Sequence, residues 1–323
     1  MLKDLKAPEG LYIHERLAGA LGIPVFHENL QSTAVVATAA LMNALALAEK
    51  GVAAARLVIC GAGTVGIGCA RLFRAIGAAP ENLFVYDARG LLHDGRDDLN
   101  PYQRAFARSD GPATLAEGLK GADVFVGASA GGVMTPEMVR SMARFPIVFA
   151  LATPEPEIGY EDARACRHDV IVSTGLTQFP NAVVDFLSFP YVLRGALDVH
   201  ATRITDGMLL GAAHALADLG REEVVEEVSR AYGGTPLSFG PEYILPRPID
   251  PRILVRESAA AQQAPLRRRT TTPVFARIFK SRSEDQPLTY PASSSTASSK
   301  PISLLPETCH IPVKPGLTRR RTK

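Results

Sequence analysis

The chain has 323 residues, of which 46% are apolar, so it can bury the core of one large domain or two smaller ones. It has no run of about 18 consecutive apolar residues, and its first residues, MLKDLKAPEG, lack the apolar core of a secretory signal. We therefore expect no membrane partner and a cytoplasmic location. The four cysteines form no C-x-x-C pair, as expected of buried thiols in a reducing compartment.

The net charge of +2 hides two regions of opposite sign. Residues 265–323 carry twelve Lys or Arg against three Asp or Glu, which leaves residues 1–264 with a net charge of −7. Low-complexity stretches such as PASSSTASSKP, and the lack of apolar periodicity, predict that residues 265–323 are a disordered basic tail. No aromatic or motif framework accompanies the basic clusters, so we do not expect nucleic acid as a partner. Residues 1–264 are predicted to form the folded domain, with residues 1–30 as a lead-in segment.

The elements predicted first in the chain are helical. Residues 11–21 have the apolar spacing of a short helix, and Ile23–Phe26 form an extended segment in which Pro24 favours an edge strand. Residues 33–50 predict a long helix because apolar residues recur at helical spacing among many alanines. Gly51 is expected to terminate this helix in a left-handed conformation.

The stretch from residue 56 to residue 87 predicts a strand, a glycine turn, a helix and a second strand. Leu57–Cys60 is a continuous apolar run, typical of a parallel strand buried on both faces. The motif G-x-G-x-x-G follows at once. In it, Gly61 permits the tight turn, Gly63 lets a diphosphate approach the backbone, and Gly66 lets the helix pack on the strand.

Further residues of this unit are candidate cofactor-binding residues. Thr64 and Val65 lie where the first N–H groups of the helix and its positive dipole end can hold phosphate. The second strand, Leu83–Tyr86, ends in Asp87, about 20 residues beyond the glycines, where a carboxylate can accept hydrogen bonds from a ribose. Arg89 can instead meet a 2′-phosphate, so both NAD and NADP are candidate cofactors. The alternative is a Rossmann domain whose glycines serve only packing.

Strand and helix continue to alternate after this unit. Strands are predicted at residues 122–127, 146–151 and 170–172, and helices at 114–119, 135–143, 161–166, 205–219 and 252–262. This alternation predicts an α/β fold with a doubly wound parallel, Rossmann-like sheet and flanking helices. Ligands of such sheets bind beyond the carboxyl ends of the strands. We therefore expect one crevice, with Ser129 as a further cofactor contact, lined by the loops at residues 61–66, 87–90, 128–132, 152–157 and 173–181.

Several segments together resemble the malic enzymes, particularly the bacterial type, over about residues 2–262. In the family's order these are LKAPEGLYIHERL, IPVFHENLQSTAVV, GAGTVG, ADVFVGASAGGVMTPEMV, FALATPEPE, STGLTQFPNAVVDFLSFPYVLRGALDV and PRPIDPR. The resemblance implies the NAD(P)-binding domain of an oxidoreductase that oxidises malate and decarboxylates the product to pyruvate with Mg²⁺ or Mn²⁺. It implies a dinucleotide and malate, or a related small acid, as ligands.

The sequence departs from the family at the metal positions. The family pattern places metal-ligand positions at Asp4, Glu28 and Asn29, but Lys3 replaces a glutamate beside Asp4, and Asn29 replaces an aspartate. Divalent cations of this kind prefer several carboxylate oxygens. We therefore expect the metal affinity of this chain to be low.

The substrate positions also depart from the family. Thr153 replaces an asparagine, and Val184 and Asp185 replace two asparagines that contact malate and nicotinamide in the family. The chain is expected to begin after the family's domain with the catalytic tyrosine and lysine, so we assign no catalytic residue. We expect impaired malate decarboxylation. The alternatives are a non-catalytic dinucleotide-binding or regulatory module, one half of a split enzyme with a separately encoded partner domain, and a different reaction; a homodimer is also compatible with the family.

Overall fold

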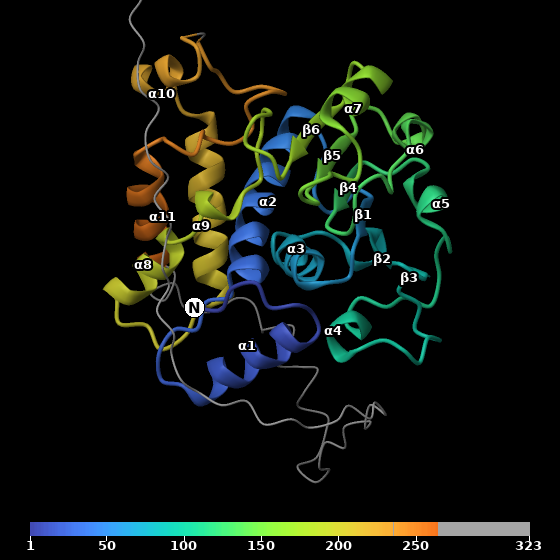
Figure 1. The fold of residues 1–323 in the computed structure, drawn as a ribbon, viewed down its shortest axis with the longest axis horizontal. Coiled ribbons are helices and arrows are strands. Elements are labelled where there is room, and N and C mark those ends of the chain that lie inside the picture. Colours follow the sequence, from blue (N-terminus) through green and yellow to red (C-terminus); the bar gives the residue numbers. More distant parts are fainter. Residues whose placement is uncertain (235, 264–323) are drawn as a thin grey trace, which may run out of the picture. The chain divides into compact units, whose positions relative to one another are not determined.

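The computed structural model describes residues 1–234 and 236–263 (Figure 1). The tail predicted for residues 265–323 lies outside the described residues. Six strands form one sheet in the order β3-β2-β1-β4-β5-β6. Their bounds are β1 (Leu57–Cys60), β2 (Leu83–Asp87), β3 (Gly90–Leu91), β4 (Val124–Gly127), β5 (Ile147–Ala150) and β6 (Ile171–Thr174). All pairings are parallel except that of β2 with β3, so the predicted doubly wound, Rossmann-like sheet is confirmed.

The central strand β1 is where the chain changes from one half of the sheet to the other. Leu57 pairs with Leu83 of β2 on one side and with Val124 of β4 on the other. All four residues of β1 are buried, because helices cover both faces of the sheet. Crevices of such sheets open beyond the carboxyl ends of the strands at this switch point.

Two layers of helices cover the sheet (Figure 1). Leu57 and Ile59 of β1 belong to a core formed with α2 (Glu28–Leu47), α3 (Thr64–Ala75), α8 (Tyr191–Asp198), α9 (Asp206–Arg221) and α11 (Arg252–Gln263). Val58 and Cys60 point the opposite way, into a core formed with α5 (Leu115–Leu119), α6 (Pro136–Ser141) and α7 (Tyr160–Cys166). The remaining helices are α1 (Glu9–Ala20), η1 (Pro80–Asn82), α4 (Pro101–Arg104), η2 (Asp185–Leu187) and α10 (Glu226–Ala231).

The helix α2 is the core of one layer. By length and composition it could cross a membrane, but 78% of its apolar window is buried inside the protein, against α3, α9 and the sheet. It begins at Glu28, before the predicted start at residue 33. It ends where Glu49, and not Gly51, adopts a left-handed backbone with φ 55°. The predicted role of Gly51 was therefore wrong.

Two other predictions differ from the structure. Ile23–Phe26 forms no strand, and the chain there makes only an isolated bridge between Leu2 and His27. Proline lacks the N–H that a ladder needs, and α2 starts directly afterwards. The helix α8 forms in a region for which no element was predicted; its buried residues Val192, Gly195 and Ala196 pack against α11.

The helix α11 buries one carboxyl completely, that of Glu257. Burial raises the pKa of this carboxyl well above its usual range, and neither of its oxygens has a hydrogen-bond partner among the described residues. An acid whose pKa is higher in the folded than in the unfolded state takes up a proton on folding. Its contribution is therefore most favourable at acidic pH and is lost as the pH rises above about 4.3, the ordinary glutamate pKa.

The substitution Glu257→Gln should stabilise the protein at alkaline pH, because the amide never has to lose or gain a charge. We expect the free energy of unfolding, measured with urea, to rise by about 1–2 kcal/mol at pH 8 and by much less at pH 5. Glu227→Gln on α10 is the control, since Glu227 is exposed. Equal effects of the two substitutions at pH 8 would contradict a raised pKa for Glu257.

Candidate functional site

The glycine turn after β1 depends on two close backbone approaches. Gly61 has φ 114°, and a side-chain carbon there would lie 2.3 Å from the carbonyl oxygen of Ala128. At Gly66 such a carbon would lie 1.8 Å from the carbonyl oxygen of Gly61. A carbon at Gly63, in contrast, would meet no atom within 4 Å. The backbone is therefore tightly packed at Gly61 and Gly66, whereas open space lies next to Gly63.

The helix α3 begins directly at this turn. Gly63 is its N-cap and provides no side-chain hydrogen bond, and no acidic residue lies in the first turn. Thr64 is buried and Val65 is half-buried. The first N–H groups of a helix have no acceptor within the helix, and they lie at its positive dipole end. The turn and helix thus present main-chain donors suited to a diphosphate.

A crevice of about 510 Å³ opens at the carboxyl edge of the sheet. Four of the five loops predicted to meet there contribute to it, and the 87–90 loop does not. The first turn of α2 and residues around η2 supply the rest of the wall. The lining residues are Asn29, Thr33, Val65, Ala128, Ser129, Leu151, Ala152, Thr153, Gly175, Leu176, Thr177, Gln178, Val183, Val184, Asp185 and Phe186.

A buried carboxylate, that of Glu157, joins two loops of this crevice. Its Oε1 accepts hydrogen bonds from the N–H of Ser129 at 2.8 Å and from the Ser129 hydroxyl at 3.3 Å. Its Oε2 accepts one from the N–H of Ala152 at 3.0 Å. Ser129 thus lies in the crevice as predicted, but its hydroxyl contacts Glu157. The sequence analysis missed Glu157, because the pattern gives no sign that this loop acid is fully buried.

Asp87 lies at the end of β2, and its carboxylate already has a cationic partner. Arg96 donates from Nη1 to Oδ1 at 2.9 Å and from Nη2 to Oδ2 at 2.7 Å, and the N–H of Arg89 also donates to Oδ1. The guanidinium of Arg96 also contacts Asp98 and holds the pKa of that carboxyl at about 2. Arg89 is largely exposed, with its guanidinium 3.2 Å from Asp98. Arg96 was missed because it lies in a polar loop without a motif.

The predicted metal positions form no cluster of carboxylates. Glu28 and Asn29 open α2, and the Glu28 carboxylate pairs with the ammonium of Lys3 at 3.2 Å. The Oδ1 of Asn29 is buried and has no hydrogen-bond partner among the described residues. Asp4 is exposed and does not line the crevice. In residues 1–234 and 236–263, no group of three or more His, Cys, Asp or Glu could hold a metal ion.

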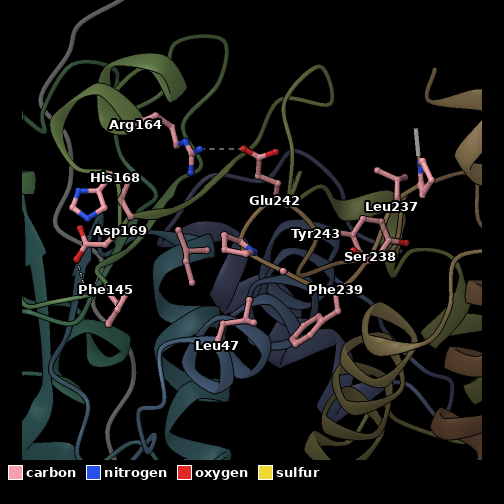
Figure 2. A pocket seen from close by; sticks show the side chains of 15 residues that line it. Leu47, Phe145, Arg164, His168, Asp169, Leu237, Ser238, Phe239, Glu242 and Tyr243 are labelled. Carbon is pink, nitrogen blue, oxygen red and sulfur yellow. Dashed lines mark hydrogen bonds and ion pairs between the residues drawn. The ribbon is translucent and has the colours of Figure 1, made fainter. Parts of the chain in front are cut away.

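A larger cavity of about 810 Å³ lies at the opposite, amino edge of β5 and β6 (Figure 2). Arg164 and Glu242 form an ion pair at its wall at 3.1 Å, and Asp169 accepts a hydrogen bond from the N–H of Phe145 at 2.8 Å. None of the predicted site residues lines this cavity. Three of them, Asn29, Val65 and Ser129, instead line the crevice at the carboxyl edge.

Comparison with known proteins gives a consistent result. Residues 30–231 match the family model described as malic enzyme, NAD binding domain. The chain is 48% identical over 263 residues to the NADP-dependent malic enzyme of Halomonas elongata and 42% identical over 264 residues to the NAD-dependent malic enzyme of Rhizobium meliloti. The Entamoeba histolytica malic enzyme, a solved crystal structure, has 33% sequence identity to this chain, and the two structures superpose with a TM-score of 0.73.

These matches cover most of this chain but only part of each relative. They include 81% of this chain in all three cases. They span 62% of the Halomonas enzyme, 34% of the Rhizobium enzyme and 53% of the Entamoeba chain. The similarity therefore concerns the dinucleotide-binding part of these proteins.

Replacing the carboxylate between the two loops should loosen the crevice. In Glu157→Gln one of the two N–H groups, from Ser129 or Ala152, would face an amide NH₂ and lose its acceptor. We expect the free energy of unfolding to fall by about 1–3 kcal/mol, measured by urea unfolding. Glu155→Gln, two residues away and exposed, is the control and should have little effect. A loss no larger than that of the control would show that Glu157 does not hold these loops.

Proposed function

This chain belongs to the malic enzyme family, and we propose that it binds NAD or NADP in the crevice at the carboxyl edge of the sheet. The diphosphate would rest on the first turn of α3. The observation that carries this proposal is the open space over Gly63, next to main-chain N–H groups that no acidic side chain of the helix approaches. We assign Gly61, Gly66, Thr64 and Val65 to the same diphosphate site.

The adenosine end of the dinucleotide would lie toward β2. Asp87 is the candidate ribose acceptor, and Arg96 neutralises its charge through two hydrogen bonds. A 2′-phosphate would therefore meet the ion pair of Asp87 with Arg96 and the exposed guanidinium of Arg89. The relatives include both an NADP-dependent and an NAD-dependent enzyme. On these grounds we propose that the site accepts either cofactor.

The nicotinamide end would enter the crevice beside Ser129 and Thr153. Both residues line it, together with Asp185 from η2. Malate, or a related small acid, would bind next to the nicotinamide. Thr153 and Asp185 replace amide side chains of the family pattern there, so the polar contacts offered to such an acid differ from those of the family.

We propose that this chain alone decarboxylates malate poorly. The replacements at Lys3 and Asn29 weaken the hard-cation site that the reaction uses, because an ammonium and a neutral amide stand where carboxylates are preferred. The second candidate function, favoured by these replacements, is a non-catalytic dinucleotide-binding or regulatory module in the cytoplasm. It would act as a homodimer or with a separately encoded partner domain.

Dinucleotide binding can be tested at Gly63 with little risk to the fold. Its backbone has φ −92°, which any residue adopts, and a methyl group there meets no protein atom within 4 Å. The added carbon would occupy the space of the diphosphate, so Gly63→Ala should weaken NADPH and NADH at least about tenfold in calorimetric titration, which corresponds to roughly 1.4 kcal/mol. Gly51→Ala is a matched control, with equal room and a position outside the crevice. Equal affinities of the two variants would rule out the proposed diphosphate site.

The catalytic and non-catalytic candidates differ in turnover. With malate, Mn²⁺ and either NAD⁺ or NADP⁺, we expect dinucleotide binding in calorimetry but reduction of the nicotinamide at least about a thousandfold below common enzyme rates of 1–10³ s⁻¹. The measurement is absorbance of the reduced nicotinamide with the purified chain. Turnover at ordinary enzyme rates would contradict the proposed impairment.

A further inference from the structure

The ammonium of Lys3 is held in a fixed position beside the crevice. Its Nζ lies 3.2 Å from both carboxylate oxygens of Glu28. Main-chain hydrogen bonds fix the segment on either side, from the N–H of Leu2 to the carbonyl of Phe26 at 2.7 Å and from the N–H of Glu28 to the carbonyl of Leu2 at 3.0 Å. The Glu28 side chain is only 5% exposed, whereas that of Lys3 is 53% exposed. The ammonium therefore caps a buried carboxylate from the solvent side.

The polar groups around this ion pair form the end of the crevice. Asn29 and Asp185 both line it. The ammonium of Lys3 is thus the positive charge paired with the Glu28 carboxylate at this end of the crevice.

These residues do not fit a divalent cation. Mg²⁺ and Mn²⁺ require several hard oxygen ligands, normally including more than one carboxylate. The Glu28 carboxylate is paired with an ammonium, Asn29 offers only a neutral carbonyl oxygen, and Asp4 is exposed to solvent. A dication placed beside Glu28 would also be repelled by the charge of Lys3.

We propose that the Lys3 ammonium is a built-in cation that takes the place of Mg²⁺ or Mn²⁺ at the start of α2, beside the crevice. It neutralises Glu28 and fastens residues 1–6 to the start of α2 without any metal. An ammonium can donate hydrogen bonds to a hydroxyl or carboxylate of a bound acid, but it polarises a carbonyl less than a dication does. The inference concerns the cation and does not depend on where the dinucleotide binds.

The proposal predicts that metal binding can be created by removing this lysine. The double variant Lys3→Glu/Asn29→Asp adds two carboxylates and should bind Mn²⁺ at least tenfold more tightly than the unmodified chain in calorimetric titration with MnCl₂. The matched control is Lys6→Glu/Asn29→Asp, which makes the same change of charge at an exposed lysine that forms no ion pair within the described part of the chain. The affinity of this control for Mn²⁺, and its Tm in millimolar Mn²⁺, should be the same as those of the unmodified chain.

A second comparison keeps the proposal testable if the double variant does not fold. Without metal, Lys3→Gln should lower the Tm by about 2 °C relative to Lys6→Gln, because Glu28 loses its cation. Equal Tm values for these two variants would overturn the proposal, as would Mn²⁺ binding by the unmodified chain that is as tight as that of Lys3→Glu/Asn29→Asp. Titration of the same samples with NADPH shows separately whether the dinucleotide site is intact.

Discussion

The close packing of backbone segments at the carboxyl end of β1 is the constraint on which the site depends. Gly61 contacts Ala128 of the β4 loop, Gly66 contacts Gly61, and a side-chain carbon at Gly68 would lie 2.3 Å from the carbonyl oxygen of Leu30 in α2. These contacts seat α3 directly on the strand and against α2. The amino end of α3 is thereby aimed at the crevice, and any larger residue at Gly61, Gly66 or Gly68 would push the helix away.

The two buried acids next to the crevice, Glu157 and Glu28, both have partners within the protein. Glu157 accepts main-chain N–H groups from two loops, and Glu28 accepts the ammonium of Lys3. Both acids are thus used inside the protein, where an unpaired buried charge would cost several kcal/mol. The first turn of α3 itself carries no acidic residue, which favours an anionic cofactor at the helix. Because both acids are already paired within the protein, they make a poor site for a metal.

The sequence predicted the parts of the fold that have strong local patterns. The strands β1, β4 and β5 are continuous apolar runs, and β2 and β6 begin with apolar runs, because helices bury both faces of the sheet. The glycine spacing marked the turn after β1. The strand β3 was missed because it has only two residues, which pair with the end of β2 in a tight hairpin. The helix α8 was missed because it packs against α11, which is distant in the sequence.

The side-chain partners at the site were less predictable. The pairing of Asp87 with Arg96 depends on the path of a polar loop, and the role of Glu157 depends on burial of a charge that the sequence pattern places in solvent. The replacements at Lys3 and Asn29 were visible in the sequence through the family resemblance. The contact of Lys3 with Glu28 was visible only in the structure.

The central claim is that a dinucleotide diphosphate binds the backbone at the start of α3. A crystal structure of the chain grown with NADP⁺ tests it most directly. We expect the diphosphate oxygens within hydrogen-bond distance of the main-chain N–H groups at Thr64 and Val65, with the ribose toward Asp87 and no metal between Glu28 and Asn29. A dinucleotide bound elsewhere, or an open space over Gly63 that stays empty at saturating NADP⁺, would contradict the account.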